Sequence, residues 1–352
     1  MRDEMVQLMA KEVQAAKVGL ELKVFANASL VKPHDQWKAL TSGQIDLTLL
    51  PLDYASSTHP EFGATLMPGL VRNHAHAERM NHSAFMNDIR ALIHRGGATV
   101  LADAWLAGGL GGRDQCILEP QDAKNLKVRS AGATFAKMWR GAGAAPVTLP
   151  SSELHAALQR GQIQALDTSS VSFVSFQLYE QIKCLTAPGE DTLWFMYQPV
   201  LISNKALVKL NETQRKALVA AGKKAQVFFS NESRKLDEEL VQTFKRHQIK
   251  VVTLSKAQAQ RLALSAHDGL ARSIRPVHTP FDGDTLFAMA TGTENSPADV
   301  LLLSVMAAEA TALATVDAIL SARGVQTLTG WLPAAHDLDG AQRQGIGTQT
   351  GA

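Results

Sequence analysis

Two groups of polar side chains in this sequence could together hold a small carboxylate. Arg129 lies in the segment DAKNLKVRS, and the planar fork of a guanidinium matches the two oxygens of a carboxylate. The second group is the run Asp167-Thr168-Ser169-Ser170, whose hydroxyls could contact the same ligand. A single arginine on a strand is more often a surface residue or part of a structural ion pair than a ligand-binding residue. Ser and Thr at the end of a strand often form turns. The residues alone therefore leave both interpretations open.

Two other clusters could do different chemistry. His74, His76 and His82 are close in sequence, but positions 74 and 76 fall on different faces of a helix, which favours surface histidines over a metal site. His278 and the acidic residues of segment 282–284 could bind a cation or transfer protons, although a tight turn explains the same pattern. We therefore expect no metal, no cofactor and no catalytic residue.

Strands and helices must place Arg129 and the hydroxyl run next to each other. Alternating short strands and helices predict an α/β fold with largely parallel sheets. Leu126–Ser130 and Leu166–Ser169 are predicted strands that end at the two polar groups. Ligand crevices form beyond the carboxyl ends of strands in such sheets, so Arg129, Thr168 and Ser169 could converge there.

The remaining elements follow from apolar periodicity and helix breakers. Further strands are predicted at Leu20–Phe25, Asp46–Leu52, Thr99–Trp105, Pro146–Leu149, Trp194–Ser203 and Ile249–Leu254. Helices are predicted at residues 3–16, around Trp37, at 74–95, at 132–142, from Ser151, at 173–182 and at 213–247. Residues 108–112 are expected to form a glycine-rich loop.

The last hundred residues have a different character. Ser255 and Gln258 form a capping box for a predicted helix at Ser255–Ile274. A second helix is predicted from Ser296-Pro297 to Arg323, because proline is favoured at the first helical position. The polar tail at 331–352 is expected to be disordered.

Composition excludes several classes of protein. Lys plus Arg number 35 and Asp plus Glu 33, which gives no electrostatic basis for a nucleic-acid or membrane partner. No apolar run is long enough to span a bilayer, so no membrane insertion of this chain is expected. Cys116 and Cys184 argue against a disulfide framework or a cysteine metal site but leave a single bridge open. The segment MRDEMVQLMAKEVQ lacks the apolar core and cleavage site of an export signal.

Four sequence blocks occur in an order that is typical of one protein family. They are KALTSGQIDLTLLPLDYASSTHPEF, DAKNLKVR, GAGAAPVTLPSSELHAALQRGQIQALD and VLISNKALVKLNETQRKAL. Together they resemble the solute-binding proteins of TRAP-type transporters (DctP-like) over about residues 1–250. This resemblance implies a non-enzymatic protein whose two α/β lobes, crossed by one long helix, close on a small organic-acid ligand. It also implies TRAP transporter membrane subunits as partners and a periplasmic location.

The resemblance also suggests roles for individual residues. The family's carboxylate-binding arginine matches Arg129, and the position after its "VDG" block matches Thr168, with Ser169 beside it. Gln198 matches a position that can line the cleft. Trp105, at a strand end, could form a cleft wall or be a core aromatic.

The chain departs from the family pattern at two places. Residues 163–165 read IQA where the family has "VDG", and the family's first strand and export signal have no counterpart. The first lobe is therefore expected to be truncated, and the chain as written is expected to stay in the cytoplasm. The predicted domains are a two-lobe region at 1–252 (lobe one about 1–105 with part of the 205–250 helix, lobe two about 106–204), a segment at 253–330 and the tail at 331–352.

The segment after residue 253 resembles a different family. LSKAQAQRLALSAHDGLARSIRPVHTPFDGDTLFAMATG is similar to the C-terminal part of DmpA-like L-aminopeptidase/D-esterases, over about residues 254–330. Those hydrolases free an N-terminal Ser or Thr nucleophile by self-cleavage. The sequence has no Asn-Thr or Gly-Ser pair, Gly292-Thr293 lies after the motif, and a helix cap explains Asn295-Ser296 better. The alternatives to a binding protein are an inactive hydrolase fragment and a recombined gene product with neither activity.

Overall fold

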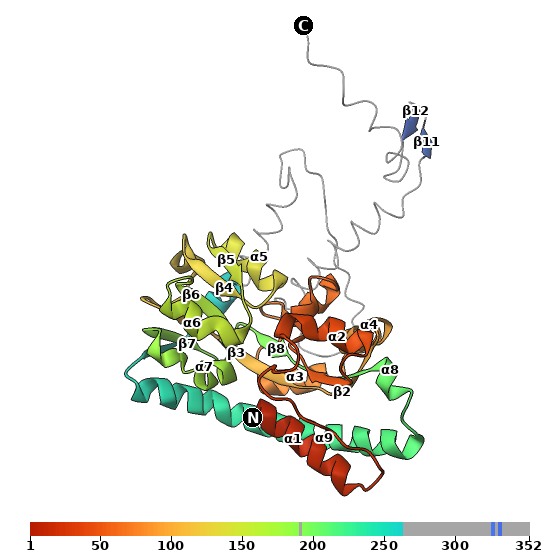
Figure 1. The fold of residues 1–352 in the computed structure, drawn as a ribbon. Coiled ribbons are helices and arrows are strands. Elements are labelled where there is room, and N and C mark those ends of the chain that lie inside the picture. The colour runs from red at the N-terminus through yellow and green to blue at the C-terminus, as the bar shows by residue number, and fades with distance from the viewer. Residues whose placement is uncertain (190–191, 263–324, 328–329, 333–352) are drawn as a thin grey trace, which may run out of the picture. The chain divides into compact units, whose positions relative to one another are not determined.

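The computed structural model describes residues 1–189, 192–262, 325–327 and 330–332 (Figure 1). The chain divides into two compact units, Met1–Phe287 and Ala288–Ala352. Within the second unit, the described residues form the antiparallel pair β11 (Val325–Thr327) and β12 (Gly330–Leu332). The two sheets, the helices and the cavity considered for function all belong to the first unit.

Two β-sheets mark two lobes in the first unit. The smaller sheet, in the first lobe, has the order β1-β9-β2, with β1 at Leu47–Leu49, β2 at Ala98–Ala102 and β9 at Val200–Ser203. The larger sheet, in the second lobe, has the order β10-β7-β3-β6-β4-β5, and β8 pairs with β3. Its strands are β3 at Trp105–Gly112, β4 at Lys127–Ser130, β5 at Ala145–Thr148, β6 at Ala165–Ser169, β7 at Cys184–Ala187, β8 at Phe195–Tyr197 and β10 at Lys250–Thr253.

The predicted two-lobed α/β fold is confirmed, but the sheets are mixed rather than largely parallel. β4 is parallel to β5 and β6, and β10 is parallel to β7. In contrast, β3 runs antiparallel to β6, β7 and β8, and β9 runs antiparallel to β1 and β2. Because β9 pairs with β1 and β2, Val200–Ser203 lies in the first lobe's sheet, whereas the sequence boundary assigned it to lobe two.

Helices flank both sheets (Figure 1). The α-helices are α1 at Arg2–Ala15, α2 at Gln36–Ser42, α3 at His74–Met80, α4 at Ala84–Arg95, α5 at Ala133–Gly141, α6 at Leu154–Gln159, α7 at Ser170–Ser175, α8 at Asn204–Leu207 and α9 at Glu212–Arg246. Short 3₁₀ turns lie at Pro33–Asp35, Leu52–Ala55, Pro60–Leu66, Pro120–Ala123, Ser151–Glu153 and Leu178–Glu180.

Helix α9 joins the two lobes. It starts at a capping box in which the side chains of Asn211 and Gln214 satisfy each other's backbone N–H groups. Its 35 residues make it about 50 Å long, so it packs against β2 of the small sheet and against β3, β7 and β10 of the large one. Helix α1 lies alongside it (Figure 1). A long helix at this position was predicted.

The predicted glycine-rich loop at 108–112 is wrong, because these residues form the second half of β3. The glycines are there for close packing rather than for a turn. A Cβ on Gly108 would lie 2.0 Å from the indole ring of Trp194, and one on Gly109 would lie 2.6 Å from the carbonyl oxygen of Thr186. Both neighbours can approach the strand only where it has no side chain.

The predicted strand at Leu20–Phe25 is also wrong. The segment forms no strand ladder, and Phe25 is 59% exposed. Strand β1 pairs with β9 on one side, and no described strand pairs with its other side. The segment therefore makes no ladder hydrogen bonds, and it lines the cavity instead.

Two long predicted elements are each broken by a specific residue. The helix predicted at 74–95 splits into α3 and α4, because the Ser83 hydroxyl accepts a hydrogen bond from the backbone of Met86 and starts a new helix. The strand predicted at Trp194–Ser203 splits into β8 and β9 around Pro199, which has no backbone N–H to donate to a ladder.

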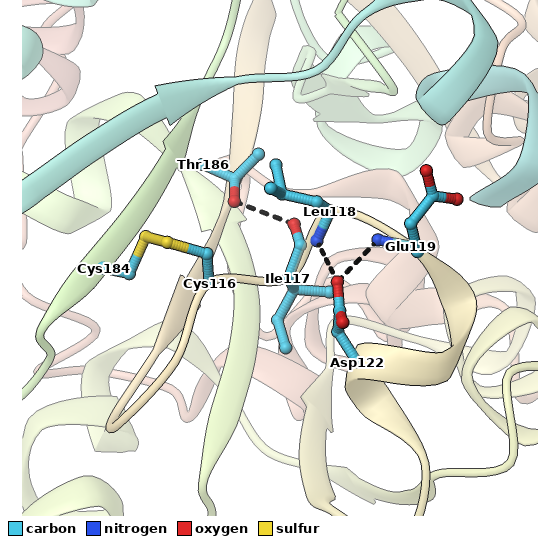
Figure 2. The surroundings of a disulfide bond; sticks show 7 residues. All are labelled: Cys116, Ile117, Leu118, Glu119, Asp122, Cys184 and Thr186. Atoms are coloured by element: carbon cyan, nitrogen blue, oxygen red, sulfur yellow. Dashed lines mark hydrogen bonds between the residues drawn. A yellow bond between two sulfur atoms is a disulfide. The ribbon is translucent and has the colours of Figure 1, made fainter.

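A disulfide joins Cys116 to Cys184, so the single bridge that the sequence left open is formed. The two residues are 68 positions apart, and the bond ties the loop after β3 to the first residue of β7 (Figure 2). Around it, Thr186 donates to the carbonyl of Ile117 at 2.9 Å, and Asp122 accepts the backbone N–H groups of Leu118 and Glu119. The bridge therefore fastens the loop after β3 to an inner strand of the large sheet.

Of the elements predicted after residue 253, the structure describes only residues up to 262 and a few residues between 325 and 332. Residues 256–262 are helical, and the capping box of Ser255 and Gln258 is present. Trp331 and Leu332 belong to β12, which corrects the expectation that the tail is disordered from 331 onward. The rest of the predicted helices, the tail, and the His278 and 282–284 cluster lie outside the described residues.

Candidate functional site

A cavity of about 1110 Å³ lies between the two lobes. Apolar side chains such as Leu47 and Leu49 line it from the first lobe. Four of the five predicted ligand residues also line it, which are Arg129, Thr168, Ser169 and Gln198. The sequence interpretation that brought β4 and β6 to one cleft is therefore consistent with the geometry.

Arg129 points out of β4 and is almost fully enclosed, with 2% of its surface exposed. Nε donates to the carbonyl of Leu149 at 2.9 Å, and Nη1 donates to the carbonyl and the Oδ1 atom of Asp167 at 2.6 and 3.2 Å. Nη2 donates to the hydroxyl of Tyr54 at 3.3 Å. A guanidinium carries five N–H groups, so these four bonds leave one N–H, on Nη2, for a ligand.

Asp167 balances the charge of Arg129 from the neighbouring strand β6. Its carboxylate also accepts the indole N–H of Trp139 at 2.7 Å and the backbone N–H of Ala131 at 3.2 Å. Complete burial raises the pKa of Asp167 to about 6, although Arg129 and these two donors lower it. Arg129 thus forms a structural ion pair, which was one of the two sequence interpretations, and it also lines the cavity.

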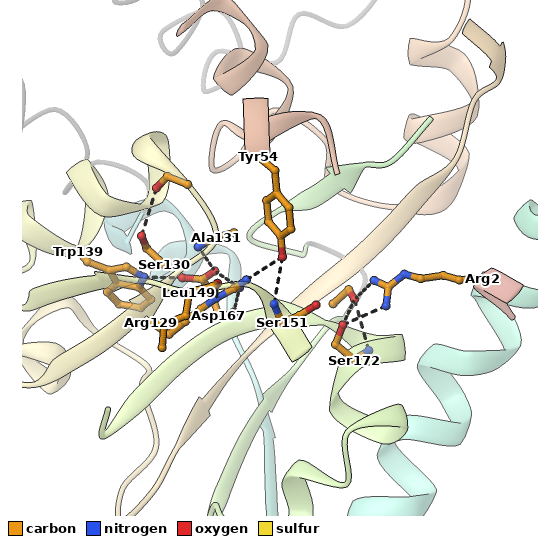
Figure 3. Close-up of polar contacts among 12 residues, drawn as sticks. Arg2, Tyr54, Arg129, Ser130, Ala131, Trp139, Leu149, Ser151, Asp167 and Ser172 are labelled. Atoms are coloured by element: carbon orange, nitrogen blue, oxygen red, sulfur yellow. Dashed lines mark hydrogen bonds and ion pairs between the residues drawn. The ribbon is translucent and has the colours of Figure 1, made fainter. Parts of the chain in front are cut away.

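Tyr54 brings the first lobe onto Arg129 of the second (Figure 3). Its hydroxyl accepts hydrogen bonds from Arg129 Nη2 and from the backbone N–H of Ser151 at 3.1 Å. Those two bonds use both acceptor positions of the phenol, so its own O–H remains to be donated. Tyr54 lines the cavity, and the ring of His34 packs on it with centroids 4.4 Å apart. Burial lowers the pKa of His34.

The hydroxyl run at the end of β6 has two roles. Thr168 is buried, lines the cavity and makes no side-chain hydrogen bond within the described residues, so its hydroxyl is available to a ligand. Ser169 caps α7, because its hydroxyl accepts from the backbone N–H of Ser172. Gln198 follows β8 and accepts a hydrogen bond through Oε1 from Arg2 at 2.9 Å.

The fifth predicted residue, Trp105, lies away from the cavity. It is buried, its indole N–H donates to Asn81 Oδ1 at 2.7 Å, and its ring packs on Tyr197 with centroids 4.7 Å apart. Trp105 is not among the residues that line the cavity. Its surroundings are those of a core aromatic, which was the other interpretation that the sequence left open.

Arg2 is a cavity residue that the sequence did not suggest. It enters from the first turn of α1, and its guanidinium reaches Gln198, Ser169 and Ser172. Figure 3 shows Arg2 beside Ser172. Burial lowers the pKa of Arg2 to about 10, so it stays charged at neutral pH. A charged residue at the start of an amphipathic helix normally faces water, and no pattern in the segment distinguishes this one.

Asp53 is a second buried group that the sequence did not suggest. Neither carboxyl oxygen has a hydrogen-bond partner among the described residues, and burial raises the pKa of Asp53 to about 7, although Arg129 lowers it. The side chain fits against the start of α5 because Gly132 has no Cβ, which would lie 2.9 Å from Oδ2. One signal was available for both Asp53 and Tyr54, since they directly follow the apolar run that ends at Leu52.

The described part of the chain holds no group of three or more His, Cys, Asp or Glu that could bind a metal ion. Of the three clustered histidines, His74 bonds to Asp237 Oδ2 at 2.6 Å. Within the same residues, no helix is both long and apolar enough to cross a membrane.

Known proteins resemble most of this chain. The family model described as bacterial extracellular solute-binding protein, family 7, matches residues 3–268. A solute-binding protein of Albidiferax ferrireducens is 33% identical over 255 residues, which cover 72% of this chain and 75% of that protein. A TRAP periplasmic solute-binding protein of Rhodoferax ferrireducens, solved with bound malonate, has a TM-score of 0.74 and 32% identity, covering 77% of this chain and 86% of its own.

A receptor of Bordetella pertussis that binds pyroglutamic acid shares the fold, with a TM-score of 0.70 and 22% identity over 76% of this chain and 88% of its own. The C-terminal part matches other proteins. An uncharacterized aminopeptidase of Mycobacterium bovis is 40% identical over 98 residues, which cover 23% of this chain and 28% of that protein.

Proposed function

We propose that this chain, which belongs to the bacterial extracellular solute-binding proteins of family 7, captures a small organic acid and delivers it to a TRAP-type membrane transporter. The acid binds in the cavity between the lobes, with its carboxylate on Arg129. The protein makes no covalent bond to the ligand and carries out no reaction.

One observation carries this proposal, which is the meeting of Arg129 and Tyr54 across the two lobes. The free N–H of Arg129 Nη2 and the undonated O–H of Tyr54 are adjacent donors at the wall of one cavity. A carboxylate that accepts both would hold one lobe against the other. Hydrogen bonds from charged donors to carboxylates are stronger than neutral ones, so the ligand stabilises the closed arrangement.

The solved relatives support an organic acid as the ligand. The Rhodoferax ferrireducens protein was solved with malonate, and the Bordetella pertussis receptor binds pyroglutamic acid. Both molecules carry a carboxylate that Arg129 could hold. The hydroxyl of Thr168 is placed to contact the remainder of the ligand, since it faces the same cavity without a partner among the described residues.

The disulfide supports a periplasmic location. Disulfides persist in oxidising compartments such as the bacterial periplasm and are rare in the cytosol. The Cys116–Cys184 bond is therefore consistent with the extracellular character of the family. There the loaded protein would dock on the transporter's membrane subunits.

The C-terminal segment is proposed to add no hydrolase activity. The sequence lacks an Asn-Thr or Gly-Ser pair ahead of the aminopeptidase-like motif, and the match covers only 28% of the Mycobacterium bovis protein. Mass spectrometry of the purified chain tests this directly. An intact chain of 37.9 kDa without peptide or amide turnover supports the proposal, whereas self-cleavage with turnover contradicts it.

Calorimetric titration with malonate and pyroglutamate, each beside the amide that has no carboxylate left (malonamide and pyroglutamamide), tests the binding function. The wild type should bind at least one acid, and its amide should bind about 10-fold more weakly or worse, because a neutral amide forms weaker hydrogen bonds with an arginine. Arg160→Met, which removes an exposed arginine from the end of α6, should bind like the wild type. Failure of every acid to bind, or equal binding of acid and amide, contradicts the proposal.

A further inference from the structure

Arg2 lies in the cavity with its charge unbalanced. Its guanidinium donates to three neutral oxygens, which are Gln198 Oε1 at 2.9 Å, Ser172 Oγ at 3.2 Å and Ser169 Oγ at 2.9 Å. It forms no salt bridge to any described carboxylate. The acidic residues that line the cavity are Asp3, Glu21 and Asp46, and all three are exposed.

The two arginines of the cavity therefore differ in what they can offer a ligand. Asp167 neutralises Arg129, and four of the five Arg129 N–H groups are bonded within the protein. Arg2 has no such partner, and its three bonds leave two of five N–H groups free. Withdrawing a charge from water is costly unless an opposite charge or a set of hydrogen bonds compensates it, so an anionic group of the ligand would supply the opposite charge that Arg2 lacks within the protein.

Strand β6 anchors both guanidiniums. Arg129 is held by the carbonyl of Asp167 and Arg2 by the hydroxyl of Ser169, two residues further along the same strand. Residues i and i+2 of a strand are about 7 Å apart and face the same side of the sheet. Figure 3 shows Arg2 and Arg129 on either side of the Tyr54 hydroxyl. A dicarboxylate in this cavity could therefore place one carboxylate on each guanidinium.

We propose that Arg2 is a second anion-binding residue of this cavity, and that the ligand carries two anionic groups, one for Arg2 and one for Arg129. This inference rests on the proposed function and narrows it from organic acids in general to short dicarboxylates. Arg2 sets the preference for the second charge, while Ser169, Ser172 and Gln198 orient its guanidinium.

Calorimetric titration of the full chain with three diacids and their monoamides tests the inference. The probes are malonate, succinate and glutarate, each paired with the amide that replaces one carboxylate. The wild type should bind at least one diacid about 10- to 100-fold more tightly than its monoamide. Arg2→Gln should remove that preference by weakening the binding of the diacid. Its affinity for the monoamide should change less than about 3-fold, because the monoamide has a neutral carboxamide where the diacid has its second carboxylate.

Two further variants separate charge from fold. Arg2→Lys keeps the positive charge and should retain part of the preference. Lys11→Gln removes the same charge from an exposed position on the same helix and should bind both probes like the wild type. If Arg2→Gln binds the monoamide as the wild type does, the cavity of this variant is intact. If Arg2→Gln does not fold, the ratio of diacid to monoamide affinity in the wild type still tests the inference.

The inference and the proposed function fail in distinguishable ways. If the wild type binds acids without preferring the diacid, or if Arg2→Gln weakens diacid and monoamide equally, the role of Arg2 is overturned and the binding function stands. If the wild type binds no acid at all, both are overturned.

Discussion

Replacing Arg129 should damage the fold as well as the binding site, because Asp167 would lose its cation. Arg129→Met leaves a buried carboxylate with only the N–H groups of Trp139 and Ala131. Breaking one partner of a buried ion pair costs about 3–5 kcal/mol of unfolding free energy. We expect a loss of that size at pH 8, and a smaller loss at pH 5, where Asp167 can take up a proton.

Neutralising Asp167 as well should recover much of this loss. In the double variant Arg129→Met/Asp167→Asn, the carboxamide needs no cation and can still accept from Trp139. Urea unfolding followed by tryptophan fluorescence, with the single variants beside it, closes a double-mutant cycle. A favourable coupling of about 2 kcal/mol or more is expected. Additive losses in the cycle would refute the claim that Asp167 depends on Arg129.

Three further changes should alter stability. Gly108→Ala should lower the unfolding free energy by about 3 kcal/mol in urea denaturation, because the added methyl meets the buried indole of Trp194; a loss below ~1 kcal/mol would contradict this packing. Burial raises the pKa of Asp53 to about 7 from 3.8, so the wild type should lose stability as pH rises from 4 to 7. Asp53→Asn should escape that loss, and its advantage in thermal or urea unfolding should grow by up to about 4 kcal/mol over this range; a constant difference would show that Asp53 titrates normally. The double change Cys116→Ser/Cys184→Ser should cost about 4 kcal/mol, as expected for a link between residues 68 apart, and unchanged urea unfolding would show that the bond does not form.

The sequence predicted the fold well wherever local signals agreed with the sheet. The long helix α9 follows from apolar periodicity, and the capping box of Ser255 from side chains that pair over three residues. The two lobes follow from the family resemblance. The predictions failed where a distant neighbour decided the outcome. The glycines at 108–112 belong to β3, where distant residues such as Trp194 at Gly108 and Thr186 at Gly109 pack closely on the strand, and Leu20–Phe25 pairs with no described strand.

The candidate site was predictable to a similar extent. Arg129, Thr168, Ser169 and Gln198 line one cavity, as the ends of two predicted strands and the family resemblance suggested. Arg2 was not predictable, because a helix-start arginine usually faces solvent and only the tertiary fold turns it onto β6.

The most direct test of the account is the affinity of the double variant Arg129→Met/Asp167→Asn for the acid that the wild type binds best. Its stability is expected to be close enough to the wild type for calorimetry, so its binding reports on the ligand contact alone. We predict that the acid binds the wild type and Arg160→Met alike and binds the double variant at least about 10-fold more weakly. Equal affinity of the double variant and the wild type would contradict the central claim that Arg129 holds the carboxylate.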